Sequence, residues 1–333
     1  MDLNDKISIV RNILKNEKTA IGFSGGADST LLAYLSSKYA EDTLAITVDN
    51  HLMPNAFIEN AQKIAESFKI NHEIIDIDFY ENKNFLSNDA GRCFICRNIM
   101  YDQIKKTANE KGYDFICDGN NISDLVINRP GILITYEKEF KTPLIEAKLT
   151  SKEIHEYLNK NSIPYSKSTT CLATRIPINT PATYEKIKRI GYCEDYISSN
   201  TDCEIVKVRD LDEFCMIEVD KLDEIVKNNI FNSEFKKQGF KKVVLNLNPI
   251  DDDESIDIDY KNNGFAYQLP FTIDIENTKK QLKETITYAN DRIIIENIEI
   301  YENGLIKGND FESYSDALET FMELLPKLRR NIR

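Results

Sequence analysis

Two cysteines with a short spacing are the clearest candidates for chemistry in this sequence. Cys93 and Cys96 are separated by two residues, so that one turn of chain can hold both thiols against one metal ion or cluster. Arg92 and Arg97 flank the pair, and both arginines favour the thiolate forms, as would a helix N-terminus beside them. The spacing is compatible with a redox dithiol, half of a zinc site or half of an iron–sulfur site.

A third cysteine lies in surroundings that favour reactivity. Cys171 sits in a polar stretch, with Arg175 four residues later, which is more typical of a reactive thiol than of a core residue. The remaining cysteines lie in or beside apolar elements and are expected in the core: Cys117, Cys193, Cys203 and Cys215. The total of seven is odd, and the N-terminal residues lack an export signal, so we expect free or metal-bound thiols in the cytoplasm instead of disulfides.

The sequence Ser24-Gly25-Gly26-Ala27-Asp28-Ser29 predicts a phosphate-binding loop. It lies between an apolar strand, 19–23, and a helical pattern, 31–39. The glycines let the backbone approach a ligand closely, and loop amides at a helix N-terminus bind anions. Both serines can donate hydrogen bonds, whereas Asp28 beside phosphates requires a cation such as Mg²⁺. The loop lacks a Gly-Lys-Ser/Thr ending, so γ-phosphate hydrolysis is not indicated. The alternative is a helix cap in a sharp turn.

Apolar runs that alternate with helical patterns must position these residues. They predict an α/β domain over 1–150, with a parallel sheet covered by helices on both faces. Its expected strands are 19–23, 44–49, 72–78 and 115–118, and its expected helices are 3–17, 31–39, 54–69 and 97–111.

From Thr150 the pattern changes, and we expect a smaller α+β domain over 151–249. Its expected helices are 151–160, 182–199 and about 221–238, and its expected strands are 203–209, 214–219 and 242–247. The acidic stretch 251–256 predicts a linker. A C-terminal α+β extension over 250–333 is predicted to contain a strand near 260, a helix over 275–289, a strand pair around 293–306 and a helix over 313–329. It lacks chemistry-bearing motifs, so a role in assembly or partner binding is expected.

The loop at Ser24–Ser29 resembles that of the PP-loop ATP pyrophosphatases, over about residues 18–150. The resemblance implies an adenine nucleotide alpha hydrolase-like fold. It also implies cleavage of ATP between the α- and β-phosphates, transfer of AMP to an acceptor oxygen, and displacement of AMP by nitrogen or sulfur. Adenine is then held by backbone groups near Val48, and Gly119 is a further nucleotide contact.

A longer series of motifs resembles LarE, a family of ATP-dependent sulfur transferases, over about residues 5–248. The motifs are Gly91–Cys96, Asp118–Asp124 with Arg129-Pro-Gly131, Thr142–Thr150, Cys171–Arg175, Lys207–Arg209 and Met216–Val219. The resemblance implies adenylation of a carboxylate of pyridinium-3,5-biscarboxylic acid mononucleotide and its conversion to a thiocarboxylate, for synthesis of a nickel-pincer cofactor.

The family contains two branches that differ in their sulfur source. One sacrifices the sulfur of a cysteine at the position of Cys171. The other holds a [4Fe-4S] cluster with three cysteines, and Cys93, Cys96 and Cys171 fit that set. We favour the cluster, because an exchangeable sulfide acts repeatedly and a sacrificed cysteine acts once.

Cations in the second domain are candidates for binding the substrate's anionic groups. Lys207 and Arg209 alternate with apolar residues, which places both on one face of a strand, where a solvated face is the alternative. Lys207 stands where the family tends to have arginine, and it cannot form the same bidentate contact. Arg175 is a further candidate.

Charge separates the competing functions. The net charge of −13 argues against a nucleic acid as the main partner, because phosphate binding needs a basic surface. It therefore favours a small-molecule nucleotide substrate over tRNA, although a tRNA thiolase with a three-cysteine cluster is the leading alternative. A non-catalytic nucleotide sensor or scaffold is the other. We also expect a homo-oligomer without membrane contact, since no apolar run is long enough to span a bilayer.

Overall fold

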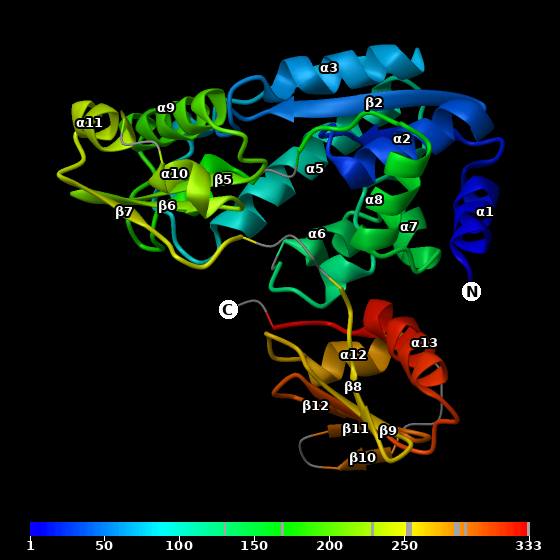
Figure 1. Cartoon of the computed structure of the whole chain (residues 1–333). Coiled ribbons are helices and arrows are strands. Elements are labelled where there is room, and N and C mark those ends of the chain that lie inside the picture. Colours follow the sequence, from blue (N-terminus) through cyan, green and yellow to red (C-terminus); the bar gives the residue numbers. More distant parts are fainter. Residues whose placement is uncertain are drawn as a thin grey trace.

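A four-stranded parallel sheet forms the centre of the first part of the chain (Figure 1). The computed structural model describes residues 1–129, 131–167, 170–227, 230–250, 255–282, 287–289 and 292–331. The sheet order is β3-β2-β1-β4, with strands β1 Lys18–Gly22, β2 Asp42–Asp49, β3 Asn71–Asp76 and β4 Phe115–Cys117. Six consecutive residues of β2, 43–48, are buried, as a parallel strand covered on both faces requires. The predicted α/β class is confirmed.

Helices cover this sheet, and their apolar faces explain why they form. In α1, Leu3–Leu14, the buried residues Ile7, Val10 and Leu14 recur at helical spacing, and Asp2 caps the first turn. The other long helices of this part are α2 Ala27–Tyr39, α3 Phe57–Phe68, α5 Arg92–Glu110 and α8 Ser151–Lys160.

The core of this first part continues beyond residue 150. Ile154 and Leu158 of α8 are fully buried in the same apolar cluster as Ile7 and Leu31. The Lys6 ammonium of α1 also lies 2.7 Å from a carboxylate oxygen of Glu153. Helix α8 begins at its own capping box, formed by Thr150 and Glu153. Its apolar side chains belong to the core around the first sheet.

Several short helical segments were not predicted. They carry too few residues to show a periodic pattern, and they connect the longer elements. These segments are η1 Phe79–Glu81, α4 Lys83–Leu86, η2 Ser123–Leu125, α6 Ile132–Glu137 and α7 Pro143–Glu146.

The second part of the chain folds around a three-stranded sheet of order β5-β6-β7. Strand β5 runs antiparallel to β6, and β7 runs parallel to β6. Three of the cysteines expected in the core, Cys193, Cys203 and Cys215, are buried here. The elements are η3 Leu172–Arg175, α9 Tyr184–Asn200, β5 Val206–Leu211, β6 Phe214–Val219, α10 Leu222–Val226, α11 Ile230–Lys237 and β7 Lys242–Leu245.

The C-terminal module, residues 255–331, contains a six-stranded antiparallel sheet of order β10-β11-β12-β13-β9-β8. Its strands are β8 Asp259–Lys261, β9 Gly264–Gln268, β10 Thr287–Ala289, β11 Arg292–Ile295, β12 Ile298–Tyr301 and β13 Leu305–Gly308. Its helices are α12 Ile275–Gln281, α13 Tyr314–Leu324 and η4 Leu325–Lys327. Most of the expected acidic linker, 251–254, lies outside the described residues.

The predicted helix over 275–289 is wrong at its C-terminal end. Helix α12 ends at Gln281, and 287–289 form β10, which pairs with β11. Thr287 and Tyr288 favour strands, and the neighbouring strand supplies backbone hydrogen bonds that a sequence pattern does not reveal.

The C-terminal module packs against the first part of the chain, below α6 in Figure 1. Its apolar core, which includes Phe265 and Phe321, also contains Ile122, Leu125 and Ile132 from the first part. Lys148 adds an ion pair to Glu323 at 2.6 Å. Among the described helices, none combines the length and the apolar character that crossing a bilayer demands.

Candidate functional site

A cavity of about 390 Å³ opens beside the carboxyl ends of β1, β2 and β4. Because the strand order reverses between β1 and β4, this is the edge where parallel sheets commonly bind ligands. The lining combines residues from four segments: Ser24, Gly26, Asp28 and Ser29; Val48 and Asn50; Arg92, Cys93, Cys96, Arg97 and Tyr101; and Asp118, Gly119, Asp124 and Arg129. Cys171 and Thr174 complete this set from the second part of the chain.

The predicted phosphate loop forms part of the cavity wall. Gly25 has a φ of +73°, a left-handed conformation that favours glycine. It lies behind the wall, where an added Cβ would come within 3.3 Å of Ala61 and Ile64. Gly26 caps α2, and the hydroxyl oxygens of Ser24 and Ser29 lie 3.1 Å apart. The loop thus presents hydroxyls and the N-terminus of a 13-residue helix, which suits an anion.

Gly119 joins the loop after β4 to the phosphate loop. A Cβ added at Gly119 would lie 2.8 Å from the backbone nitrogen of Ser29 and 3.1 Å from its Cα. A side chain there would therefore displace the phosphate loop. Val48, near the end of β2, also lines the cavity, so the structure brings both expected nucleotide contacts to one site.

The three candidate cluster cysteines line the same cavity, although they come from segments about 75 residues apart in the sequence. The helix expected from 97 begins at Arg92, where Asp89 accepts a hydrogen bond of 2.7 Å from the Gly91 nitrogen and turns the chain. Cys93 and Cys96 consequently face the cavity from the first turns of α5. Cys171 directly precedes η3.

The electrostatics of the Cys96 and Cys171 thiols are dominated by burial. Burial raises the pKa of Cys96 far above its usual value and raises the pKa of Cys171 to about 11. Arg97 opposes the shift at Cys96, and Arg92 and Arg175 oppose it at Cys171, but neither set offsets burial. A free thiol at either position is thus protonated near neutral pH, whereas metal coordination would deprotonate it.

A candidate metal-binding trio lies apart from the three cysteines. Within the described residues, the ligand atoms of Asp49, His51 and Asp76 lie within 4.8 Å of one another. None of the three lines the cavity that the cysteines share.

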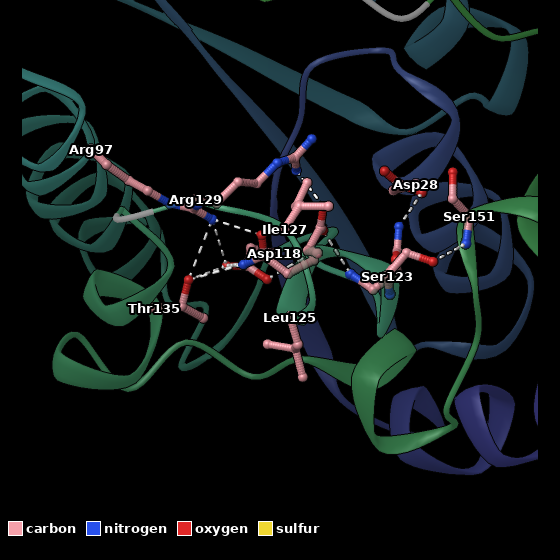
Figure 2. Close-up of polar contacts among 12 residues, drawn as sticks. Asp28, Arg97, Asp118, Ser123, Leu125, Ile127, Arg129, Thr135 and Ser151 are labelled. Atoms are coloured by element: carbon pink, nitrogen blue, oxygen red, sulfur yellow. Dashed lines mark hydrogen bonds and ion pairs between the residues drawn. The ribbon is translucent and has the colours of Figure 1, made fainter. Parts of the chain in front are cut away.

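A buried polar network supports the cavity wall. It includes Asp118 and Arg97, to which the sequence analysis assigned no contact with each other. Asp118 accepts hydrogen bonds from the hydroxyls of Tyr101, at 2.7 Å, and Thr135, at 2.8 Å. Arg97 lies 3.4 Å from the same carboxylate and donates to Asn120 at 2.9 Å (Figure 2). Burial raises the pKa of Asp118, and Arg97 opposes that shift. The signal available in the sequence was a charged residue at the carboxyl end of a strand.

The loop after β4 carries a second group of polar residues. Asp124, almost fully buried, forms an ion pair with Arg129 and accepts a 3.0 Å hydrogen bond from the Asn121 nitrogen. The Asn121 side-chain amide donates to Asp28 at 3.0 Å (Figure 2). Asp28 is thereby connected to the loop that holds Arg129, and 42% of the Arg129 side chain is exposed at the cavity.

The sheet region of the chain also matches a known family in sequence. Residues 2–128 match the model of the PP-loop domain. An uncharacterized protein of Methanocaldococcus jannaschii is 32% identical over 236 residues, which cover 70% of this chain and 90% of that protein. The chain belongs to the PP-loop family.

Relatives with named activities share a shorter stretch with this PP-loop protein. A tRNA-specific 2-thiouridylase of Fusobacterium nucleatum is 32% identical over 119 residues, covering 32% of this chain and 34% of the relative. A 7-cyano-7-deazaguanine synthase of Helicobacter acinonychis is 31% identical over 120 residues, covering 36% of this chain and 46% of the relative. Members of the PP-loop family are ATP-using enzymes.

The cations expected to bind substrate lie outside the wall of the PP-loop cavity. Arg175 is 3% exposed, and its Nε lies 2.7 Å from a carboxylate oxygen of Glu194. Arg209 pairs with Glu218 at 2.7 Å and reaches the Thr174 carbonyl at 3.3 Å. Lys207 lies on the same face of β5 as Arg209. The structure thus connects Arg175 and Arg209 to the turn that follows Cys171, without bringing them to the cavity surface.

Proposed function

We propose that this protein is an ATP-dependent sulfur transferase that activates a carboxylate of a small nucleotide and replaces one of its oxygens with sulfur. One observation carries the proposal. Three cysteines from two distant segments line the same cavity as the phosphate loop, so a sulfur source and ATP would meet there. The resemblance to LarE suggests a pyridinium-3,5-biscarboxylate mononucleotide, used for a nickel-pincer cofactor, as the acceptor.

The activation step needs groups that bind phosphate and stabilise negative charge. A carboxylate oxygen of the acceptor attacks the α-phosphorus of ATP, the bond to the β-phosphate oxygen breaks, and pyrophosphate leaves with its electron pair. The amides and hydroxyls of the Ser24–Ser29 loop hold the phosphates, and Arg129 offsets the charge of the leaving group. Asp28 would hold Mg²⁺, which would supply positive charge to offset that of the phosphates.

The sulfur step uses the part of the cavity wall that carries the three cysteines. Cys93, Cys96 and Cys171 fit a [4Fe-4S] cluster, because all three line one cavity and such a cluster would take each thiolate on a different iron. With three protein ligands, such a cluster supplies an open iron for an exchangeable sulfide. Arg92 and Arg97 lie on this wall and offset the thiolate charges. When sulfur replaces AMP on the acyl carbon, the carbon–oxygen bond to AMP breaks, AMP leaves with its electron pair, and the acceptor becomes a thiocarboxylate.

The acceptor's anionic groups are proposed to contact the second part of the chain. Arg209 reaches the carbonyl of Thr174, a cavity residue three positions after Cys171, and Lys207 lies beside it on β5. Arg175 holds the turn from Cys171 to Thr174 in place through Thr170, Thr174 and Glu194. Lys207 and Arg209 would then orient the carboxylate towards ATP.

A tRNA thiolation enzyme is the second candidate. It is favoured by the relative from Fusobacterium nucleatum, whose name is tRNA-specific 2-thiouridylase. The net charge of −13 opposes it, because tRNA binding needs a basic surface.

An anaerobic iron and sulfide assay tests the cluster. We expect brown protein with about four irons per chain. Cys93→Ala should lose the iron and the colour. Cys203→Ala is the matched control, because Cys203 is buried in the core of the second part and should leave both unchanged. Colourless wild-type protein without iron after anaerobic reconstitution would contradict a cluster. Loss of one sulfur from Cys171 after turnover, seen by mass spectrometry, would establish sacrifice instead.

Pyrophosphate release distinguishes the two acceptors. The purified enzyme is given ATP with either the pyridinium nucleotide or tRNA. Release stimulated by the pyridinium nucleotide alone supports the small-molecule acceptor, whereas release stimulated by tRNA alone supports the thiolation enzyme.

A further inference from the structure

A single arginine of the C-terminal module reaches into the PP-loop region. Arg330 donates hydrogen bonds to the carbonyls of Ile127, at 2.9 Å, Arg129, at 3.3 Å, and Leu125, at 3.2 Å. Arg330 is 7% exposed, and its guanidinium carbon lies 3.8 Å from the ring centroid of Phe271, in the same module. A buried guanidinium with several donors holds this backbone firmly, because each charge-assisted hydrogen bond is stronger than a neutral one.

The three carbonyls belong to the loop that supplies Asp124 and Arg129 to the cavity. Figure 2 shows Leu125, Ile127 and Arg129 along this loop, beside Asp118. Inside the loop, the hydrogen bond from the Arg129 nitrogen to the Ile127 carbonyl is a short-range contact of 2.9 Å. Arg330 donates to the same Ile127 carbonyl, so it adds a contact from outside the loop to the ion pair with Asp124 that also holds Arg129.

Apolar packing from the same module reinforces these hydrogen bonds. Leu125 and Val126 are 5% and 6% exposed, and they pack in one cluster with Phe265 and Phe321. Ile122, in the same loop, and Ile132, the first residue of α6, belong to the same cluster. The C-terminal module therefore buries the apolar side of the loop whose polar side faces the cavity.

We propose that the C-terminal module is a positioning element for nucleotide binding, in which Arg330 fixes the loop backbone so that Arg129 faces the phosphates of ATP. This inference rests on the proposed binding of ATP in the cavity. It assigns Arg330 a role through Arg129, without contact to the nucleotide. Asp124 pairs with Arg129. Burial lowers the pKa of Arg330, and the charge of Asp124 is among those that oppose this shift.

Binding of α,β-methylene-ATP to the full chain, measured by calorimetry, tests this role. We expect Arg330→Met to weaken binding about tenfold, the size of one lost charge-assisted hydrogen bond, and Arg330→Lys to weaken it less. Arg329→Met is the matched control. Arg329 lies over the ring of Tyr136 but donates to carbonyls of its own module, so its loss should leave binding within about twofold.

A double-mutant cycle separates positioning from general destabilisation. If Arg330 acts through Arg129, Arg330→Met should have no further effect on binding in an Arg129→Met background. A full tenfold loss in that background would overturn the inference, as would wild-type affinity in Arg330→Met. Absence of binding to the wild-type protein would overturn the proposed ATP site itself. Thermal unfolding without nucleotide checks that each variant is folded. If Arg330→Met does not fold, Arg330→Lys replaces it in the cycle.

Discussion

Arg129 on the cavity wall and Arg175 in the second part of the chain each pair with a carboxylate, but they differ in how much of the arginine side chain stays exposed. Arg129 pairs with Asp124 and still exposes 42% of its side chain at the cavity. Arg175 pairs with Glu194, and their side chains are only 3% and 7% exposed. A positive residue in a sequence therefore marks an anion site only where its counter-ion leaves room for a second anion. Three substitutions probe this contrast.

The largest effect is expected where a cation is fully paired. Arg175→Met should lower the free energy of unfolding by about 3–5 kcal/mol, because it leaves the Glu194 carboxylate buried without its partner. Urea unfolding measures this change. Adding Glu194→Gln to the variant should restore part of the stability. A loss below about 1 kcal/mol in Arg175→Met would contradict the buried pair.

On the cavity side, the expected effect falls on catalysis. Gly119→Val should reduce pyrophosphate release about 100-fold, because its Cβ would displace Ser29 and the phosphate loop. Gly112→Asn is the control. Gly112 follows α5 with a φ of +81°, which asparagine tolerates, and an added Cβ meets no atom within 4 Å. Equal rates for Gly119→Val and the wild type would place ATP elsewhere.

The smallest effect is expected for a lysine on β5, and it tests whether the ATP site extends from the cavity into the second part of the chain. Lys207 lies on β5 and not on the cavity wall, so Lys207→Met should leave the ATP affinity within about twofold. The KM for the acceptor should rise about threefold, if the lysine contacts its anionic group. Steady-state kinetics with each substrate varied in turn measure both. A tenfold loss of ATP affinity would extend the nucleotide site onto β5.

Local patterns were sufficient to predict the strand–turn–helix unit that holds the Ser24–Ser29 loop. The loop Ser24–Ser29 lies within one strand–turn–helix unit, so its anion-binding character follows from neighbouring residues. The parallel sheet followed in the same way from apolar runs alternating with helices. The start of α5 was placed too late, because the turn at Asp89 and Gly91 that begins it depends on a hydrogen bond that the pattern did not reveal.

Contacts between distant segments could not be predicted from such patterns. The spacing of Cys93 and Cys96 was compatible with a redox dithiol or with half of a zinc or iron–sulfur site, and the grouping with Cys171 came from the family resemblance. The sequence pattern predicts a substrate contact at Arg175, because it does not reveal the pairing with Glu194. That partner lies 19 residues away on a different element. Likewise, neither the packing of the C-terminal module on the first part nor the contacts of Arg330 leave a periodic signature in the sequence.

The contact between Leu125 and Arg330 has a consequence for synthesis of the protein. The two residues are 205 positions apart. At a translation rate of about 5–20 residues per second, the ribosome makes Arg330 roughly 10–40 s after Leu125. During that interval the apolar side chains of Leu125 and Val126 lack the module that covers them in the finished fold. The nascent chain therefore exposes the apolar side of this loop until the C-terminal module is made. A chaperone is expected to bind there.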